Sequence, residues 1–393
     1  MATPATRDRF ESRPGSLYVG FFLNGMAIVL TGALLPRLAQ LNHMDDRQAG
    51  LLLATQSFGN FLGSFFVSSP PRRSLITGTG LTFAGLLLAS AVITGGSPLW
   101  AIYSCFLLFG FGLGEMATAI NLIIGTRNAS VRASHLSAIN FLWSLGAISS
   151  PILIAALITH LSLGKFLVLF SLPFLILLPT LLRRVGSPVP PDQSQTVACA
   201  LPRKSHSSST VFHFALLFFL YGGTEMSLSG WLASYAQRFA SATATSNPLA
   251  PAAFWAGITA GRAAGALFLH RIAERRSVTV SIGLCMLSLA ALLLSNSTAE
   301  VLVFSGAAGL CLGPFFPATV SWAIGEGLPT RILGPLFAIC GLGATTLPFL
   351  VGIVSKSTSS LRTALLLPIL YSAVILGMLA VPRPVPGPDA TMQ

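Results

Sequence analysis

Three ionisable side chains lie within long apolar stretches of this 393-residue chain: Glu115, Glu225 and Arg262. A charge at the centre of a bilayer costs about 3 kcal/mol on insertion scales, so such residues persist where they line a cavity, pair with one another or carry protons. We therefore predict that Glu115 and Glu225 are proton-coupling residues. Arg262 leaves two interpretations open, because it either compensates the charge of a glutamate or fixes the hinge that follows its own helix.

Glu115 ends the glycine-rich run Phe109-Gly-Phe-Gly-Leu-Gly-Glu115. The glycines thin one side of a helix, which lets a neighbouring helix or a ligand approach closely. One interpretation is a structural acid that is protonated and hydrogen-bonded to a neighbouring helix. The other, which we favour, is a proton or substrate site.

Glu225 belongs to a polar face of its predicted helix. Tyr221, Glu225 and Leu228 share that face through i, i+4, i+7 spacing, and Thr224 lies beside them. A carboxylate, a phenol and a hydroxyl on one face suit a polyol better than an apolar drug. We favour a functional role for this face over a purely structural one.

Further polar and aromatic residues of the apolar stretches complete a predicted solute pocket. Sugars are typically held by amide and carboxylate hydrogen bonds together with an aromatic surface. Hydrogen bonds between helices explain the asparagines and the glutamine equally well. The predicted substrate-binding residues are Asn24, Gln56, Glu115, Asn121, Asn140, Trp143, Tyr221, Glu225 and Trp231.

Composition requires a membrane protein to position these residues. Hydrophobic residues make up 53% of the chain and charged residues only 9%, against roughly 25% charged in soluble domains. A membrane-spanning helix takes about 20 mostly apolar residues, so the chain has room for twelve spans and little else. We predict an all-α membrane protein with spans at 16–40, 47–68, 74–94, 98–124, 134–160, 163–183, 211–237, 251–270, 277–297, 299–325, 331–355 and 360–381.

Short motifs recur in the same order about 200 residues apart. Phe21-Phe22-Leu23-Asn24-Gly25 is followed 197 residues later by Phe218-Phe219-Leu220-Tyr221-Gly222, and Gly59-Asn60-x-x-Gly63 is followed 202 residues later by Gly261-Arg262-x-x-Gly265. Two similar halves around a central cavity are typical of secondary transporters. The predicted domains are an N-terminal six-helix half (1–190), a cytoplasmic linker rich in proline and serine (191–210) and a C-terminal six-helix half (211–393).

The net charge of +12 reflects membrane topology. With a cytoplasmic N-terminus, sixteen Lys and Arg residues fall on the inner side and six on the outer side, leaving Arg262 inside a span. Short loops rich in Lys and Arg stay in the cytoplasm, so we expect both termini to be cytoplasmic and the protein to be a multi-pass plasma (inner) membrane protein. The basic residues are scattered without interleaved aromatics, which argues against nucleic-acid binding.

Metal sites and catalytic clusters are not predicted. No pair of the five cysteines has Cys-x-x-Cys spacing, and the six histidines include no His-Glu-x-x-His motif. A membrane-embedded enzyme would need a cluster of His, Asp or Cys near one interface, and the sequence offers none. We therefore predict that the protein is not an enzyme, that it has no cofactor apart from a coupling proton, and that it is a monomer.

The chain resembles the major facilitator superfamily over nearly its whole length, and most closely the fucose:proton symporter branch. The motifs that carry the resemblance are Phe21-Phe-Leu-x-Gly25 with Ala33-Leu-Leu-Pro36, Gly112-x-Gly-Glu115 with Asn121, Asn140-Phe-Leu-Trp143-x-x-Gly146-Ala147-Ile148-x-x-Pro151, Tyr221-x-Gly-x-Glu225 with Trp231, Gly261-Arg262-x-x-Gly265, and Gly341-x-Gly343 with Pro348. The resemblance implies that Glu115 is the branch's glutamate of coupling and sugar recognition. It also implies that the first, fourth, seventh and tenth spans line the cavity.

Two departures from the branch bear on coupling. Thr31-Gly32 stands where the branch often carries an Asn-Asp pair, whose acid is implicated in proton coupling. The loop after the second span, Gly63 to Arg73, lacks the acid of the superfamily signature. Coupling through the first span is therefore in question.

The sequence thus predicts a secondary active transporter of a sugar or similar polar solute, coupled to protons and working by alternating access. The alternative within transporters is a uniporter or an efflux carrier of a less polar solute. A sensor that has lost transport is a further alternative, kept open by the missing acid. Two groups of residues are plausible bending points or close-packing positions: Gly309, Gly313, Pro314 and Pro317 in the tenth span, and Gly341, Gly343 and Pro348 in the eleventh.

Overall fold

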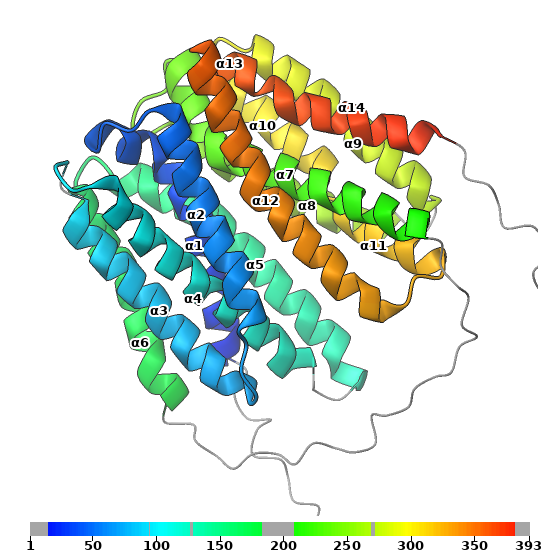
Figure 1. Ribbon diagram of the computed structural model, residues 1–393, viewed down its shortest axis with the longest axis horizontal. Coiled ribbons are helices and arrows are strands. Elements are labelled where there is room, and N and C mark those ends of the chain that lie inside the picture. Colours follow the sequence, from blue (N-terminus) through cyan, green and yellow to red (C-terminus); the bar gives the residue numbers. More distant parts are fainter. Residues whose placement is uncertain (1–14, 94, 126–128, 183–207, 269–271, 382–393) are drawn as a thin grey trace, which may run out of the picture.

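The computed structural model describes residues 15–93, 95–125, 129–182, 208–268 and 272–381. All regular structure in these ranges is helical (Figure 1). The N-terminal half consists of α1 (Gly15–Leu41), α2 (Asp46–Phe65), α3 (Pro71–Val92), α4 (Leu99–Gly125), α5 (Ala129–Leu157) and α6 (Leu163–Leu182). The C-terminal half consists of α7 (Ser208–Phe239), α8 (Leu249–Phe268), α9 (Glu274–Leu294), α10 (Thr298–Leu312), α11 (Phe315–Gly325), α12 (Thr330–Thr358), α13 (Leu361–Ala364) and α14 (Leu366–Ala380).

These elements form the twelve predicted spans, because two spans are each interrupted once. The span predicted at 299–325 breaks between α10 and α11 at Gly313 and Pro314, two of the predicted bending points. Proline supplies no backbone N–H for the helical ladder. The span predicted at 360–381 breaks at Leu365. The all-α, twelve-span fold in two six-helix halves is therefore confirmed.

Most predicted span boundaries lie within a few residues of the helix ends. The largest difference at a helix start is α5, which begins at Ala129 rather than 134. Helix α7 begins at Ser208, inside the predicted 191–210 linker, because its first turn is polar and escapes a search for apolar residues. The rest of that linker and both predicted cytoplasmic termini lie outside the described residues, so the domain boundaries stay predictions.

Ten helical stretches are long and apolar enough to cross a membrane. Helices α2 and α8 fall short of that hydropathy, because α2 carries several polar residues and α8 carries Arg262. Both helices pack between the halves: α2 contacts α12, and α5 contacts α8. Membrane helices in such positions tolerate polar side chains because their neighbours, rather than lipid, surround them. The chain is thus a multi-pass membrane protein.

The two halves contact each other through α2 with α12, α1 with α7, and α5 with α8. Helices α2 and α12 approach closely near the start of α2, where the Cβ that Gly50 lacks would lie 3.1 Å from the Cα of Gly352. Towards the opposite end α2 and α12 diverge (Figure 1). There the ring of Phe61 spans the distance to Gly341. The described conformation is therefore closed at the end that carries the α1–α2 connection.

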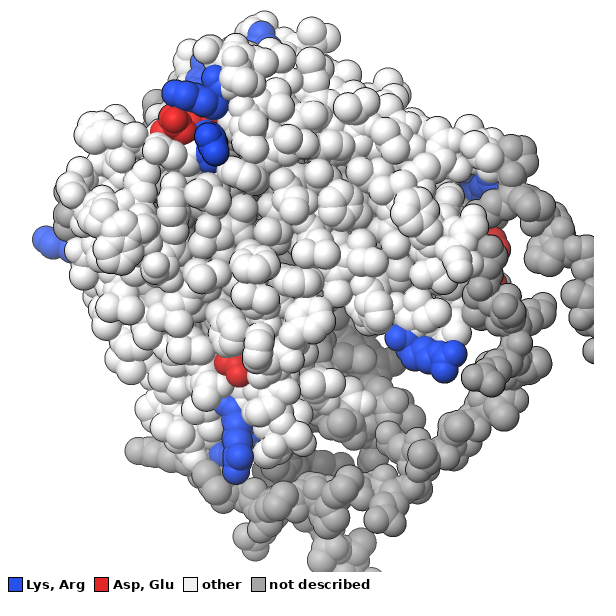
Figure 2. Space-filling model, viewed as in Figure 1, with Lys and Arg blue, Asp and Glu red and all other residues white. Residues whose placement is uncertain are grey.

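Charged side chains join the halves at this closed end. Arg238 in the last turn of α7 forms an ion pair with Asp46 in the first turn of α2, and Lys356 in the last turn of α12 lies 3.4 Å from Asp45. Acids at helix starts and bases at helix ends also suit the helix dipoles. Figure 2 shows charged side chains clustered at this upper end, while the middle of the visible face is largely uncharged.

Candidate transport site

The clearest polar network inside the C-terminal half joins Tyr221, Glu225 and Arg262. The Tyr221 hydroxyl donates to Glu225 Oε1 at 2.9 Å, and Arg262 Nη2 donates to the same oxygen at 3.3 Å. Tyr221 is buried, whereas the side chains of Glu225 and Arg262 remain 14% and 33% exposed. The predicted i, i+4 face of α7 is thus present, and Arg262 takes the first of its two interpretations, pairing with a glutamate.

The break between α10 and α11 helps to position this network. Phe315, the first residue of α11, stacks on Tyr221 with ring centroids 5.0 Å apart and planes 2° apart. Gly313 allows the break to approach α8, because a Cβ there would lie 2.9 Å from the backbone nitrogen of Arg262. A larger residue at this position would force the α10–α11 break and α8 apart.

The face of α8 that carries Arg262 points towards the N-terminal half. Arg262 lies seven residues after Trp255, so both side chains share one side of the helix. Trp255 meets Trp143 of α5 edge to face, with ring centroids 5.3 Å apart, and donates to Ser229 Oγ at 2.9 Å. This tryptophan pair is part of the contact between the halves and lies about two helical turns from the Arg262–Glu225 ion pair.

Asn24 connects three helices of the N-terminal half. Its Nδ2 donates to the carbonyl of Leu113 in α4 at 2.9 Å, and its Oδ1 accepts from Trp143 Nε1 at 3.1 Å. Asn24 is buried, and these contacts match the helix–helix interpretation left open by the sequence. Through Trp143, however, Asn24 holds the ring that contacts the other half.

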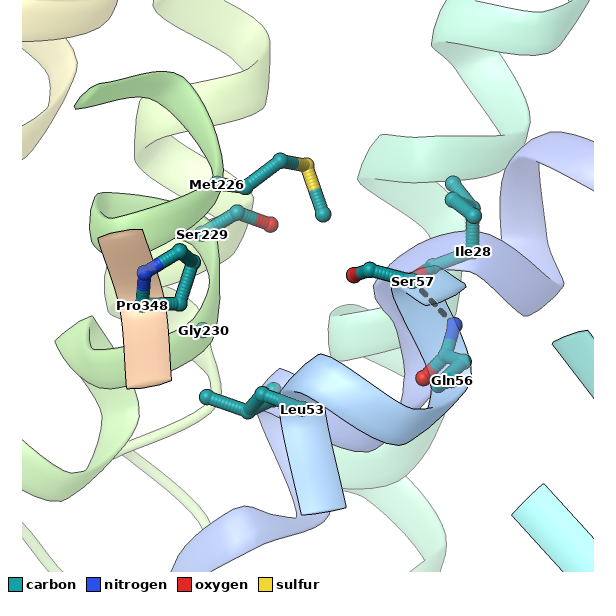
Figure 3. A pocket seen from close by; sticks show the side chains of 9 residues that line it. Ile28, Leu53, Gln56, Ser57, Met226, Ser229, Gly230 and Pro348 are labelled. Atoms are coloured by element: carbon teal, nitrogen blue, oxygen red, sulfur yellow. Dashed lines mark hydrogen bonds between the residues drawn. The ribbon is translucent and has the colours of Figure 1, made fainter. Parts of the chain in front are cut away.

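A small cavity lies between the halves beside this contact. It is lined by residues of α1, α2, α7 and α12. Gln56 is the predicted substrate residue that reaches it, with Nε2 donating to the carbonyl of Ile28 at 3.1 Å. Figure 3 shows Gln56 and Ser57 on one side of the cavity, facing Ser229 and Met226 on the other.

Glu115 lies apart from this region, within the N-terminal half. Its Oε2 accepts from Thr77 of α3 at 3.0 Å, and the residue is 7% exposed. The glycines before it do thin the helix, since a Cβ on Gly112 would lie 2.5 Å from the backbone nitrogen of Thr82 in α3, and one on Gly114 would lie 2.0 Å from the carbonyl oxygen of Asn60 in α2. The neighbours that approach are the helices α2 and α3, so the geometry matches the structural interpretation and does not bring Glu115 together with Glu225.

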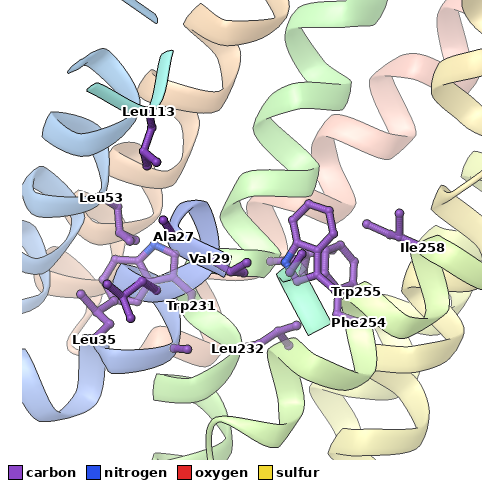
Figure 4. Packing of buried hydrophobic residues seen from close by; sticks show 14 of the residues in the cluster. Ala27, Val29, Leu35, Leu53, Leu113, Trp231, Leu232, Phe254, Trp255 and Ile258 are labelled. Carbon is purple, nitrogen blue, oxygen red and sulfur yellow. The ribbon is translucent and has the colours of Figure 1, made fainter. Parts of the chain in front are cut away.

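The other predicted residues have different surroundings. Asn121 and Asn140 are exposed, and each amide donates to the carbonyl four residues earlier in its own helix. Trp231 is fully buried and donates from Nε1 to the carbonyl of Pro348 at 3.0 Å. Its ring lies beside Leu53 of the N-terminal half (Figure 4), so it contributes to the closed interface.

Close packing against α7 explains why position 32 carries a glycine and not an acid. Gly32 faces the α7 backbone so closely that a Cβ would lie 2.5 Å from the carbonyl oxygen of Ser229. An aspartate at this position cannot fit in the described conformation. The neighbouring Thr31 is buried, and its hydroxyl has no hydrogen-bond partner among the described residues.

Trp255 and Phe315 are site residues that the sequence interpretation missed. Trp255 was detectable, because it shares the face of Arg262 at a spacing of seven. Phe315 was not, since its stacking depends on the helix break. Among the described residues, no group of three His, Cys, Asp or Glu side chains is placed to hold a metal ion.

Two curated relatives are similar to the chain over most of their length. "Bypass of stop codon protein 6" of Saccharomyces cerevisiae is 24% identical over 385 residues, covering 86% of this chain and 76% of the relative. The "Putative glucose/galactose transporter" of Helicobacter pylori is 23% identical over 390 residues, covering 90% and 91%.

Solved structures share the fold. The nucleoside transporter NupG (D323A mutant) matches with a TM-score of 0.74 and 14% identity, covering 93% of this chain and 98% of its own. FucP, the Escherichia coli fucose:proton symporter, matches in its outward conformation with a TM-score of 0.58 and 20% identity, covering 93% and 97%. The sequence model of the Major Facilitator Superfamily matches residues 17–326. With this match across most of its length, the chain belongs to the Major Facilitator Superfamily, a family of membrane transporters.

Proposed function

We propose that this protein is a secondary active transporter that carries a sugar or similar polar solute together with a proton. It works by alternating access, as a monomer in the plasma (inner) membrane, with both termini in the cytoplasm. The proton is its coupling ion, and no other cofactor is required. The names of the glucose/galactose relative and of the fucose:proton symporter support a sugar-like solute.

The observation that carries this proposal is the Tyr221–Glu225–Arg262 network. A carboxylate, a phenol and a guanidinium within a membrane helix bundle are costly unless they serve transport or pair with one another. Here they are paired, yet Arg262 and Glu225 keep part of their side-chain surface exposed. A carboxyl that is hydrogen-bonded to its neighbours and still partly exposed can exchange a proton, whereas a fully buried structural ion pair cannot do so readily.

The hydrogen-bonding capacity of the network also fits a polar solute. Among the described residues, both side chains that donate to Glu225 bind Oε1, so Oε2 is left for a proton or a solute hydroxyl. Asn140 lies one turn from Trp143 on the α5 face that meets α8, with its amide exposed. Amide, carboxylate and indole surfaces together are the usual components of a sugar site.

Alternating access is supported by the uneven contact between the halves. They are joined by ion pairs at the end that carries the α1–α2 connection and diverge towards the other end. With cytoplasmic termini, the joined end faces outward and the described conformation opens inward. Transport then requires the Arg238–Asp46 contact to break while the opposite end closes.

Uptake into proteoliposomes tests the proposal. Purified full-length protein is reconstituted and offered a panel of labelled neutral sugars, acidic sugars and nucleosides, with and without an inward proton gradient. We expect at least one sugar or sugar acid to accumulate above its equilibrium level only when the gradient is present. Equilibration unaffected by the gradient would indicate a uniporter, and the absence of uptake for every solute would contradict the proposal.

A further inference from the structure

The guanidinium of Arg262 is only partly used by its partners in the protein. Its contact with Glu225 is a single hydrogen bond of 3.3 Å, and the Tyr221 side chain lies beside it. Arginine carries five N–H donors in a planar fork, and carboxylates commonly engage two of them. Several donors therefore remain for another acceptor on the exposed third of the side chain.

Arg238, unlike Arg262, forms a bidentate ion pair with its acidic partner. Arg238 donates from Nη1 and Nη2 to the two oxygens of Asp46 at 2.8 and 2.6 Å. This pair is bidentate and lies at the closed end of the bundle. The Glu225–Arg262 pair is longer and joined through one oxygen, although its side chains are less exposed than those at many surface ion pairs and lie within the helix bundle. The difference indicates that Arg262 is not built solely to neutralise Glu225.

The charges around the network define what a further acceptor would be. The titratable groups that face Glu225 from the described elements are Tyr221 of α7, Arg262 of α8 and Cys340 of α12, while α11 contributes the rings of Phe315 and Phe316. Arg262 is the only cation among them. When Glu225 binds a proton, the guanidinium is left without a counter-charge, and a buried uncompensated charge is costly.

We propose that Arg262 binds a carboxylate of the solute, and that the transported solute is an acidic sugar or a related hydroxycarboxylate rather than a neutral hexose. This inference rests on the transport function proposed above. An anion that enters with one proton restores neutrality at Arg262, while Tyr221 and Glu225 offer hydrogen bonds to the solute hydroxyls. In the protein without solute, the ionised Glu225 carboxylate pairs with Arg262. The solute carboxylate can replace it only after Glu225 has bound a proton, so the proton and the solute anion are taken up together.

Competition binding to the purified full-length protein tests this inference. The probes are gluconate and glucuronate, compared with glucose, and affinity is measured by stabilisation against heat and by inhibition of labelled-solute exchange. We expect either acid to bind at least about tenfold more tightly than glucose, since a charge-assisted hydrogen bond is worth more than a neutral one. Both acids are ionised at about pH 6 and at about pH 8. Their binding should nevertheless be tighter at about pH 6, because Glu225 is then protonated more often.

Substitutions at Arg262 and Glu225 test which side chain causes the preference for the acids and which causes its pH dependence. Arg262→Gln should lose the preference for the acids, and Arg262→Lys should retain part of it, because lysine keeps the charge without the fork. Glu225→Gln should bind the acids without the pH dependence. Arg73→Gln, which changes an exposed arginine of α3, is the matched control and should behave as the parent protein. The pH profile of Glu225→Gln serves as a second test that does not depend on the folding of Arg262→Gln.

The outcomes separate this inference from the function it rests on. Proton-driven transport of neutral sugars without competition by either acid would overturn the inference and leave the proposed function standing. Undiminished binding of the acids by Arg262→Gln would also overturn it. Failure to transport any sugar or acid would remove the proposed function, and this inference with it.

Discussion

Arg238 at the end of α7 and Asp46 at the start of α2 form a two-point hydrogen bond across the halves, with N–O distances of 2.6 and 2.8 Å. Ser355 of α12 donates to the same carboxylate. The Asp46 side chain is 14% exposed and that of Arg238 is 40% exposed, so solvent weakens the pair only in part. The contact exists only when this end of the bundle is closed.

Arg238→Gln should therefore shift the protein towards the conformation that is open at this end. A partly exposed ion pair contributes up to about 1 kcal/mol, which corresponds to roughly a fivefold change in population. The measurement is the labelling rate of a cysteine that replaces Leu53 of α2, which is buried between the halves beside Trp231. Arg37→Gln, an exposed arginine elsewhere at the same end, is the control. Equal labelling in parent and variant would show that the pair does not hold the end closed.

Gly32→Ala should disfavour the described conformation. The added methyl would lie 2.5 Å from the Ser229 carbonyl oxygen of the facing helix, and overpacking of this kind costs about 1–3 kcal/mol. Gly80→Ala in α3 is the matched control, because a Cβ there meets no atom within 4 Å. Thermal unfolding in detergent and transport rate are compared. Identical melting and transport for the two variants would contradict the close approach of α1 and α7.

Trp143→Phe should destabilise the N-terminal half while keeping an aromatic ring against Trp255. The variant removes the donor to Asn24 Oδ1, and an unpaired buried acceptor costs about 1–3 kcal/mol. We expect a lower midpoint of thermal unfolding. In the double variant with Asn24→Leu, which removes the acceptor as well, part of the loss should be recovered. A midpoint unchanged by Trp143→Phe would show that the hydrogen bond contributes little.

Glu115→Gln should have a smaller effect on coupling than the change at Glu225. Glu115 accepts from Thr77 inside the N-terminal half, and glutamine keeps an oxygen for that bond. Proton-driven accumulation should persist at close to the parent level. Loss of accumulation with exchange intact would instead assign Glu115 the coupling role that its resemblance to the symporter branch implies.

The architecture was predictable from the sequence because membrane helices follow hydropathy and because the two halves repeat the same motifs. The pairing of Tyr221 with Glu225 was predictable too, since i, i+4 spacing places both on one helical face. The partner of Arg262 was not fixed by the sequence, because it depends on how α7 and α8 pack. The surroundings of Glu115 were ambiguous for a similar reason. Glycines in a helix indicate that something packs closely against it, but they do not distinguish a neighbouring helix from a bound solute.

The most direct test of the account is proton-driven accumulation by Glu225→Gln in proteoliposomes, measured beside solute exchange between the two sides of the membrane. The variant lacks the carboxyl that we propose carries the proton, but it keeps the size and most of the hydrogen bonding of the residue. We predict that it still exchanges solute and no longer accumulates it in response to an inward proton gradient. Gradient-driven accumulation equal to that of the parent protein would contradict the account.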